Sequence, residues 1–271
     1  MSGQGARSAD ESAAFLRELI AGAPPAARPT DEFLAMCGEY GVSFEAGDLD
    51  RLGRYVSILL HVGGRMNLTA IREPARAWVA HVFDALTLLP LLAELPAGAH
   101  VLDVGSGGGS PGIPLAIVLP ALKFSLLEAT AKKAEYLRQA CVQVGVDARV
   151  LSERAETLGQ DRAYRERFDI VTARALGPMP TALELTAPFA RVGDANAGRG
   201  SGACGRVVLV KGEKADEELA ASGRAMELLG VEHAGTIDTP TGRLVVFEKV
   251  VRSQRPYPRR DGEPKRAPLV E

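Results

Sequence analysis

The chain has 271 residues, of which 46% are hydrophobic and 24% charged, and its formal net charge at pH 7 is −2. A chain of this length and composition can bury a sizeable core, so we expect one folded domain with appendages. The near-neutral charge neither indicates nor excludes a nucleic-acid partner, because a local basic patch is enough to bind one. Three cysteines are too few for a disulfide framework, which predicts a reducing compartment.

Residues 1–30 are rich in alanine, glycine, proline and serine, with only a short helical pattern around residues 13–20, and we expect them to form a disordered extension. They lack the uninterrupted apolar core of a signal peptide, and we find no apolar run of membrane length after them. The protein is therefore predicted to be cytoplasmic, with no membrane as a partner.

Residues 31–98 have helical periodicity and are expected to form a helical segment packed on the core. One helix is predicted to begin near Asp48 and another at Pro74, where proline suits the first turn. His81 and Asp84 lie three residues apart on the second helix. Such a spacing favours a local polar contact over a substrate role.

A glycine-rich loop follows a strand that is predicted to end at Val104. Asp103, Gly105, Gly107 and Gly109 together form the pattern D-x-G-x-G-x-G. Glycines let the backbone turn tightly and approach a ligand closely, while the helix behind the loop presents its free N–H groups. The stretch is therefore predicted to bind a nucleotide-type ligand.

The same loop contains the spacing G-x-G-x-x-G at Gly107, Gly109 and Gly112, which is typical of dinucleotide binding. Asp103 argues against a dinucleotide, because a carboxylate at this position would crowd a pyrophosphate. It suits a ligand that carries a sulfonium and an α-amino group. We predict S-adenosylmethionine as the cofactor, in a loop that resembles motif I of the Rossmann-like methyltransferases, and keep an NAD-dependent oxidoreductase as the alternative.

Residues 99–251 alternate strands and helices, which predicts a Rossmann-like α/β domain with a mostly parallel sheet. The second strand ends at Glu128, about twenty residues after the loop, where a carboxylate can accept both ribose hydroxyls. The fourth strand, residues 168–174, places Arg174 at its carboxyl end, which faces the ligand crevice of an open sheet. Lys211 follows the fifth strand. We regard Arg174 and Lys211 as candidates for positioning the substrate.

The sequence predicts three further segments toward the carboxyl terminus. Residues 192–205 are predicted to be a flexible glycine-rich loop, and residues 242–250 a terminal strand that pairs antiparallel at or beside the sheet edge. Residues 252–271 form a basic tail that either holds phosphate or is merely solvated. Its basic residues are Arg252, Arg255, Arg259, Arg260, Lys265 and Arg266.

Several motifs in one order resemble the bacterial small-subunit ribosomal RNA guanine-N7 methyltransferases of the glucose-inhibited-division B family. The resemblance covers roughly residues 50–268 and is more specific than the glycine loop alone. It rests on Asn67-Leu-Thr-Ala-Ile, His81-x-x-Asp84, Ser110-Pro-Gly-Ile-Pro, Arg154-Ala-Glu156, Thr172-Ala-Arg-Ala175, Lys211-Gly212 and Tyr257-Pro-Arg.

This resemblance implies a class I methyltransferase with a seven-stranded sheet, and S-adenosylmethionine contacts at Gly105, Ser110, Ala155, Glu156 and Arg174. It also implies a guanine substrate in the decoding region of 16S ribosomal RNA, free or in a small-subunit precursor. We expect a monomer. Methylation of another RNA stays open, whereas a non-enzymatic RNA-binding module would not need this set of ligand residues.

Guanine N7 carries a lone pair at neutral pH, so it can accept a methyl group without a base first removing a proton. Positioning is therefore expected to dominate catalysis, and no metal site is needed. Because N7 gains positive charge, Arg174 is not expected to be a base. We expect it to orient cofactor or substrate and to contribute little to folding.

Overall fold

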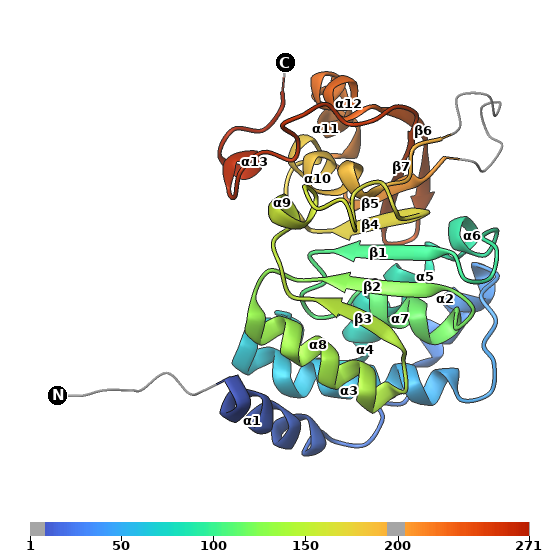
Figure 1. Cartoon of the computed structure of the whole chain (residues 1–271). Helices are drawn as coiled ribbons and strands as arrows, with labels where there is room; N and C mark the ends of the chain where they lie inside the picture. Colours follow the sequence, from blue (N-terminus) through green and yellow to red (C-terminus); the bar gives the residue numbers. More distant parts are fainter. Residues whose placement is uncertain (1–8, 194–203, 271) are drawn as a thin grey trace.

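The structure is a computed structural model that describes residues 9–193 and 204–270. Within these residues the chain forms one sheet of seven strands in the order β3-β2-β1-β4-β5-β7-β6 (Figure 1). The strands from β3 to β5 pair in parallel, and β7 pairs antiparallel with β5 and β6. The predicted fold class is confirmed. The strands are β1 (His100–Val104), β2 (Lys123–Leu127), β3 (Ala148–Leu151), β4 (Ile170–Arg174), β5 (Arg206–Lys211), β6 (Val231–Thr239) and β7 (Gly242–Lys249).

The sequence did not predict β6, which forms the sheet edge beside β7. Most of its side chains are exposed, and its register shifts between His233 and Gly235. An edge strand with a bulge has no buried face along its length, so it lacks the alternation of apolar and polar residues by which strands are recognised.

Helices cover both faces of the sheet (Figure 1). Alternate residues of β5 contribute to the two layers, with Val207 and Leu209 in one core cluster and Val208 and Val210 in another. The helices on the face that Val207 and Leu209 occupy, called the second layer, are α9 (Ala155–Leu158), α10 (Met179–Thr186), the 3-10 helix η2 (Ala187–Phe189), α11 (Ala215–Ala220), α12 (Gly223–Leu229) and α13 (Glu263–Arg266). The hydroxyl of Ser222 donates to the carbonyl of Glu218 at 2.6 Å, between the two helices α11 and α12.

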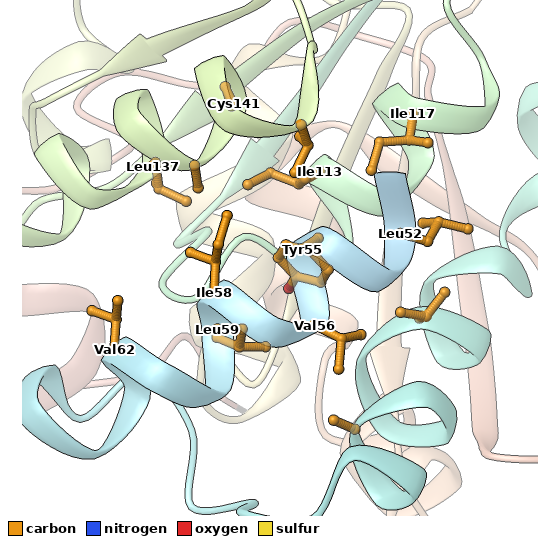
Figure 2. Packing of buried hydrophobic residues seen from close by; sticks show 14 of the residues in the cluster. Leu52, Tyr55, Val56, Ile58, Leu59, Val62, Ile113, Ile117, Leu137 and Cys141 are labelled. Carbon is orange, nitrogen blue, oxygen red and sulfur yellow. The ribbon is translucent and has the colours of Figure 1, made fainter. Parts of the chain in front are cut away.

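The first layer covers the opposite face of the sheet. In it, the amino-terminal helices pack against the helices that follow β1 and β2. Figure 2 shows α3 against α7 and α8, with Leu52, Tyr55 and Ile58 pointing into the contact. Tyr55 and Ile58 are fully buried. The helices are α1 (Ala9–Ala21), α2 (Asp31–Glu39), α3 (Asp48–Met66), α4 (Pro74–Ala77), the π-helix η1 (Trp78–Phe83), α5 (Asp84–Leu86), α6 (Leu89–Leu92), α7 (Gly112–Val118) and α8 (Ala131–Val144).

Helix α1 corrects the expectation of a disordered extension over residues 1–30. It packs on α8 and α3 and buries Leu16, Leu19 and Ile20. These three residues share one helical face and lie within the short helical pattern at 13–20, so the pattern marks a docked helix rather than a mobile extension. The chain after α1 is docked as well, because Ser57 donates to the carbonyl of Pro25 at 2.7 Å. Residues 1–8 lie outside the described residues, as does most of the predicted loop at 192–205.

One helical stretch in the described residues, Pro74–Leu92, is long and apolar enough to cross a membrane, which the sequence reading had not identified. It is 61% buried inside the protein. This is weak evidence for a membrane span, because the buried helices of a folded core meet the same criterion.

Residues 252–270 are packed on the core, so the alternative of a merely solvated tail is excluded, whereas phosphate binding by the tail stays a prediction. The guanidinium of Arg165 donates to the carbonyls of Ser253 and Tyr257 at 3.0 and 2.8 Å. Leu269 is buried. The tail runs past α9 and α10 toward the carboxyl ends of the strands (Figure 1).

Candidate functional site

A cavity of about 360 Å³ lies at the carboxyl ends of β1, β2 and β4. This is the edge at which open α/β sheets bind ligands, and the volume is within the range of small-molecule sites. Three of the predicted cofactor residues line the cavity, namely Gly105, Ala155 and Glu156. Its other walls include Leu176 and Lys265, which sequence reasoning did not select.

Gly105 has a backbone conformation that favours glycine and lies close under a side chain of the segment after β4. Its φ is +74°, and a Cβ there would lie 2.7 Å from Cδ1 of Leu176. The segment after β4 therefore closes directly over the glycine loop. Ala175, which lines the cavity, also has a positive φ of 55°, a conformation that is unusual outside glycine and often found at ligand sites. The sequence signal that was missed is Gly177-Pro178, a turn before a helix.

Asp103 lies beneath the loop and is 1% exposed. Its Oδ2 accepts from the backbone N–H of Gly112 at 3.2 Å, and its Oδ1 from the hydroxyl of Thr172 at 3.4 Å. Burial raises the pKa of its carboxyl from 3.8 to about 6, and these hydrogen bonds oppose the rise. A Cβ at Gly112 would lie 2.9 Å from this carboxylate, so the glycine permits the contact. Contact between Asp103 and a cofactor stays a prediction.

Glu128 lies at the end of β2, as predicted. Its carboxylate accepts from the N–H of Gly107 at 3.0 Å and from the N–H of Thr130 at 2.8 Å. It therefore links the glycine loop to the start of α8. The side chain of Thr130, the residue before α8, makes no capping hydrogen bond. A ribose contact at Glu128 stays a prediction.

Glu156 is held by two segments that are far apart in the sequence. Its Oε1 accepts from Nη2 of Arg154 at 3.3 Å and from the N–H of Gly262 at 3.0 Å. Arg154 also pairs with Asp261. The tail thus closes the wall of the cavity that Glu156 forms.

Ser110 does not line the cavity. Its hydroxyl donates to the carbonyl of His81 at 2.8 Å and so joins the glycine loop to the π-helix η1. The hydroxyls of Tyr55 and Tyr136 donate to the carbonyl of Gly108 at 3.1 and 3.4 Å. The loop is therefore supported from α3, η1 and α8 at once.

Arg174 makes its contacts toward the amino-terminal helices. Its Nη1 donates to Oδ2 of Asp84 at 3.0 Å and to the carbonyl of Ala80 at 2.5 Å, and its Nη2 donates to Nδ1 of His81 at 3.0 Å. The other carboxylate oxygen of Asp84 accepts from Thr241 at 2.6 Å. Because Asp84 is 7% exposed, the ion pair is structural as well. These contacts argue against the expectation that Arg174 contributes little to folding.

His81 and Asp84 meet at Arg174 rather than with each other. Since a guanidinium only donates, Nδ1 of His81 must be the acceptor, and its Nε2 carries the proton toward Thr69 at 2.8 Å. Burial and, to a smaller extent, the charge of Arg174 together lower the pKa of His81 to about 4. Three of the family motifs thus converge on one hydrogen-bonded cluster.

Lys211 ends β5, and its Nζ lies 2.5 Å from Oε2 of Glu218 and donates to the carbonyl of Gly177 at 2.9 Å. It therefore supports the loop that closes over Gly105. It does not itself line the cavity.

Residues 48–241 match the family model described as rRNA small subunit methyltransferase G, GidB. The chain belongs to this family. A ribosomal RNA small subunit methyltransferase G of Sorangium cellulosum (strain So ce56) is 42% identical over 236 residues, which cover 86% of this chain and 92% of that protein. The protein of the same name from Moorella thermoacetica is 35% identical and covers 89% and 99% of the two chains.

A solved structure, a SAM-dependent methyltransferase from Aquifex aeolicus, aligns with a TM-score of 0.44 at 15% identity over 62% of this chain and 92% of that chain. A likeness of this degree carries no argument about activity. Membership of the small subunit methyltransferase G family therefore rests on the sequence relatives, and the match spans the glycine loop, Glu128, Glu156 and Arg174.

Proposed function

We propose that this protein transfers a methyl group from S-adenosylmethionine to N7 of a guanine in the decoding region of 16S ribosomal RNA. The observation that carries the proposal is the glycine loop beside a cavity at the carboxyl ends of β1 and β2, in a member of this family. The proposal includes a cytoplasmic monomer.

The residues fit S-adenosylmethionine in three respects. Gly105 leaves room for a ligand where a Cβ would clash, Asp103 provides a buried carboxyl under the loop, and Glu156 offers a carboxylate on the cavity wall. When bound, the cofactor supplies an electrophilic methyl group. We propose that Glu128 and Ser110 act by shaping the loop, since both bond to backbone groups around it.

The chain's own task is then to orient a guanine and to keep water away from its N7. N7 needs no general base, so a neutral His81 and a charged Arg174 are compatible with the reaction. We propose Arg174 and Lys211 as positioning residues. Arg174 fixes the π-helix against the end of β4, and Lys211 fixes the loop at Gly177.

The test is to map 7-methylguanosine in small-subunit ribosomal RNA from cells with and without this protein. The expected result is one guanine that loses its methyl group when the protein is absent. Purified protein should restore that group with S-adenosylmethionine alone. Binding of NAD without measurable affinity for S-adenosylmethionine would refute the proposal.

A further inference from the structure

A second cavity, of about 610 Å³, lies beside the amino end of β4, at the sheet edge opposite the first. Nine residues line it, and six of them are arginines, whereas Glu166 is the acidic residue among them. A five-residue strand such as β4 separates the two edges by about 17 Å. The arginines are Arg162, Arg165, Arg167, Arg191, Arg252 and Arg255.

Some of these arginines have structural partners. Arg191 pairs with Asp169 at 2.9 Å, and Arg252 lies 3.7 Å from Glu166. Arg165 donates to three backbone carbonyls and so fixes the start of the tail. These contacts neutralise part of the positive charge and build the walls of the cavity.

The remaining arginines leave an excess of positive charge. Arg162 and Arg255 are exposed, and neither side chain has a hydrogen-bond or ion-pair partner within the described part of the chain. Burial lowers the pKa of Arg165 from its ordinary value; Glu166 opposes this, and the charge of Arg255 adds to it. Crowded guanidinium groups without enough carboxylates favour an anion, and their planar forks match phosphate oxygens.

Along the tail, the arginine cavity and the cofactor cavity each share a lining residue with a third cavity that lies between them. Arg255 lines both the arginine cavity and a middle cavity of about 920 Å³. Glu156 lines both the middle cavity and the cofactor cavity. Tail residues such as Pro258 and Arg260 form one wall of the middle cavity. The three cavities therefore follow one another along the tail from one edge of the sheet to the other.

We propose that the arginine cavity binds phosphates of the RNA backbone, and that the RNA follows the tail from there to the cofactor cavity. This inference rests on the proposed function, because it requires an RNA substrate. It assigns a second anchoring point about one strand length from the reacting guanine. Such a point would fix the register of the RNA without reading its bases.

RNA is favoured over a lipid surface by what surrounds the arginines. Among the large apolar side chains that are exposed in the described residues, Val251 is the one next to them in the chain. A single valine gives little apolar area for insertion into a bilayer. The family relatives are named for action on ribosomal RNA, which supplies the phosphates.

The test compares the double variant Arg162→Gln/Arg255→Gln with the charge-matched control Arg17→Gln/Arg28→Gln, whose arginines are exposed in the amino-terminal part. Binding of a small-subunit ribosomal RNA transcript is measured against salt concentration. The slope of log affinity against log salt is negative, and we expect its magnitude to decrease by roughly 1 for each arginine removed. We expect the affinity at 0.1 M salt to fall by about tenfold or more. The control should keep the wild-type slope.

Three further measurements separate the outcomes. Thermal melting and S-adenosylmethionine binding should be unchanged in the double variant, and its KM for RNA should rise while kcat at saturating RNA stays the same. An unchanged slope in the double variant would overturn the inference. It would also be overturned if the wild type binds anionic phospholipid vesicles and the substitutions abolish that binding but leave RNA binding intact. If the wild-type protein does not methylate the RNA, the proposed function is refuted. That result is distinct from a failure of the arginine-cavity proposal, because the salt dependence of RNA binding is measured without turnover.

Discussion

Arg259 and Glu184 form a two-pronged ion pair that fastens the tail to α10. Nε of Arg259 lies 2.8 Å from Oε1 and Nη2 lies 2.6 Å from Oε2 of a carboxylate that has no exposed surface. The backbone N–H of Arg259 donates to the same Oε1 at 2.8 Å. Since α10 also lines the cofactor cavity, this pair couples the tail to the site.

Replacing Arg259 with alanine should destabilise the protein, because it leaves a buried carboxylate without its partner. We expect the free energy of unfolding to fall by about 3 to 5 kcal/mol. Urea denaturation measures it. Arg260→Ala removes an exposed arginine from the next position and should change stability by less than about 0.5 kcal/mol. Equal losses in the two variants would show that the tail is not held by Glu184.

The sequence predicted the parts of the site that depend on neighbouring residues. A strand, three glycines and a helix follow one another around Asp103, and local conformational preferences determine that arrangement. The partners of each side chain were not predictable in this way. Gly262 donates to Glu156 across 106 positions, and Arg174 donates to Asp84 across 90. Only the folded topology brings such residues together.

The docking of the two ends of the chain could not be predicted from the sequence, for the same physical reason at each end. The face of α1 consists of Leu16, Leu19 and Ile20, which acquire a role only when α8 and α3 lie beneath them. The tail is rich in arginine and proline, a composition typical of solvated segments. Its docking depends on buried Glu184, whose position in the fold cannot be deduced from periodicity.

His81 should make the protein sensitive to acid. Its folded-state pKa is about 4, below the ordinary value of 6.5, so the unfolded chain binds a proton first as the pH falls. The contribution of neutral His81 to stability is present above pH 6.5 and is lost as the pH falls toward 4. Allowing for partial exposure, we expect a loss of about 2 kcal/mol.

The variant His81→Gln tests this, because an amide does not titrate in this range and can still accept from Arg174 and donate to Thr69. Chemical denaturation at several pH values between 4 and 8 gives the difference between wild type and variant. That difference should vary with pH over this window. His100→Gln, at an exposed position at the start of β1, is the matched control. Parallel pH curves for His81→Gln and wild type would contradict the assignment.

Asp103 should affect stability in the opposite direction. Its folded-state pKa of about 6 lies above the ordinary 3.8, so the unfolded chain loses the proton first as the pH rises. The free energy of unfolding therefore falls between pH 3.8 and 6, and the cost of the buried charge is fully present above pH 6. Asp103→Asn should remove this cost and raise stability at pH 8 by about 1 kcal/mol or more.

The variant Asp103→Asn should also weaken the binding of S-adenosylmethionine. A cationic ligand near Asp103 favours the ionised carboxylate, so the affinity of the wild type for S-adenosylmethionine should rise from pH 5 to pH 7. In Asp103→Asn the affinity should be about tenfold lower at pH 7 and should vary little with pH. Calorimetric titration measures both. Glu153→Gln, on the rim of the cavity, is the control and should keep the wild-type pH dependence.

Arg174 should act in folding and in catalysis, and the two roles can be separated. Arg174→Ala leaves nearly buried Asp84 with Thr241 as its remaining side-chain partner, so we expect a loss of about 3 kcal/mol in the free energy of unfolding. If Arg174 also orients substrate or cofactor, catalytic efficiency in the folded fraction should fall roughly ten- to hundredfold. Urea denaturation and single-turnover methylation of guanine are the two measurements.

The double variant Asp84→Asn/Arg174→Gln distinguishes these roles, because two amides can bond to each other without leaving a buried charge unpaired. We expect it to recover most of the stability that Arg174→Ala loses. Turnover should stay low, since the guanidinium that fixes His81 and the end of β4 is still missing. Recovery of both stability and turnover would mean that Arg174 serves only to neutralise Asp84, and its proposed role in positioning the substrate would have to be abandoned.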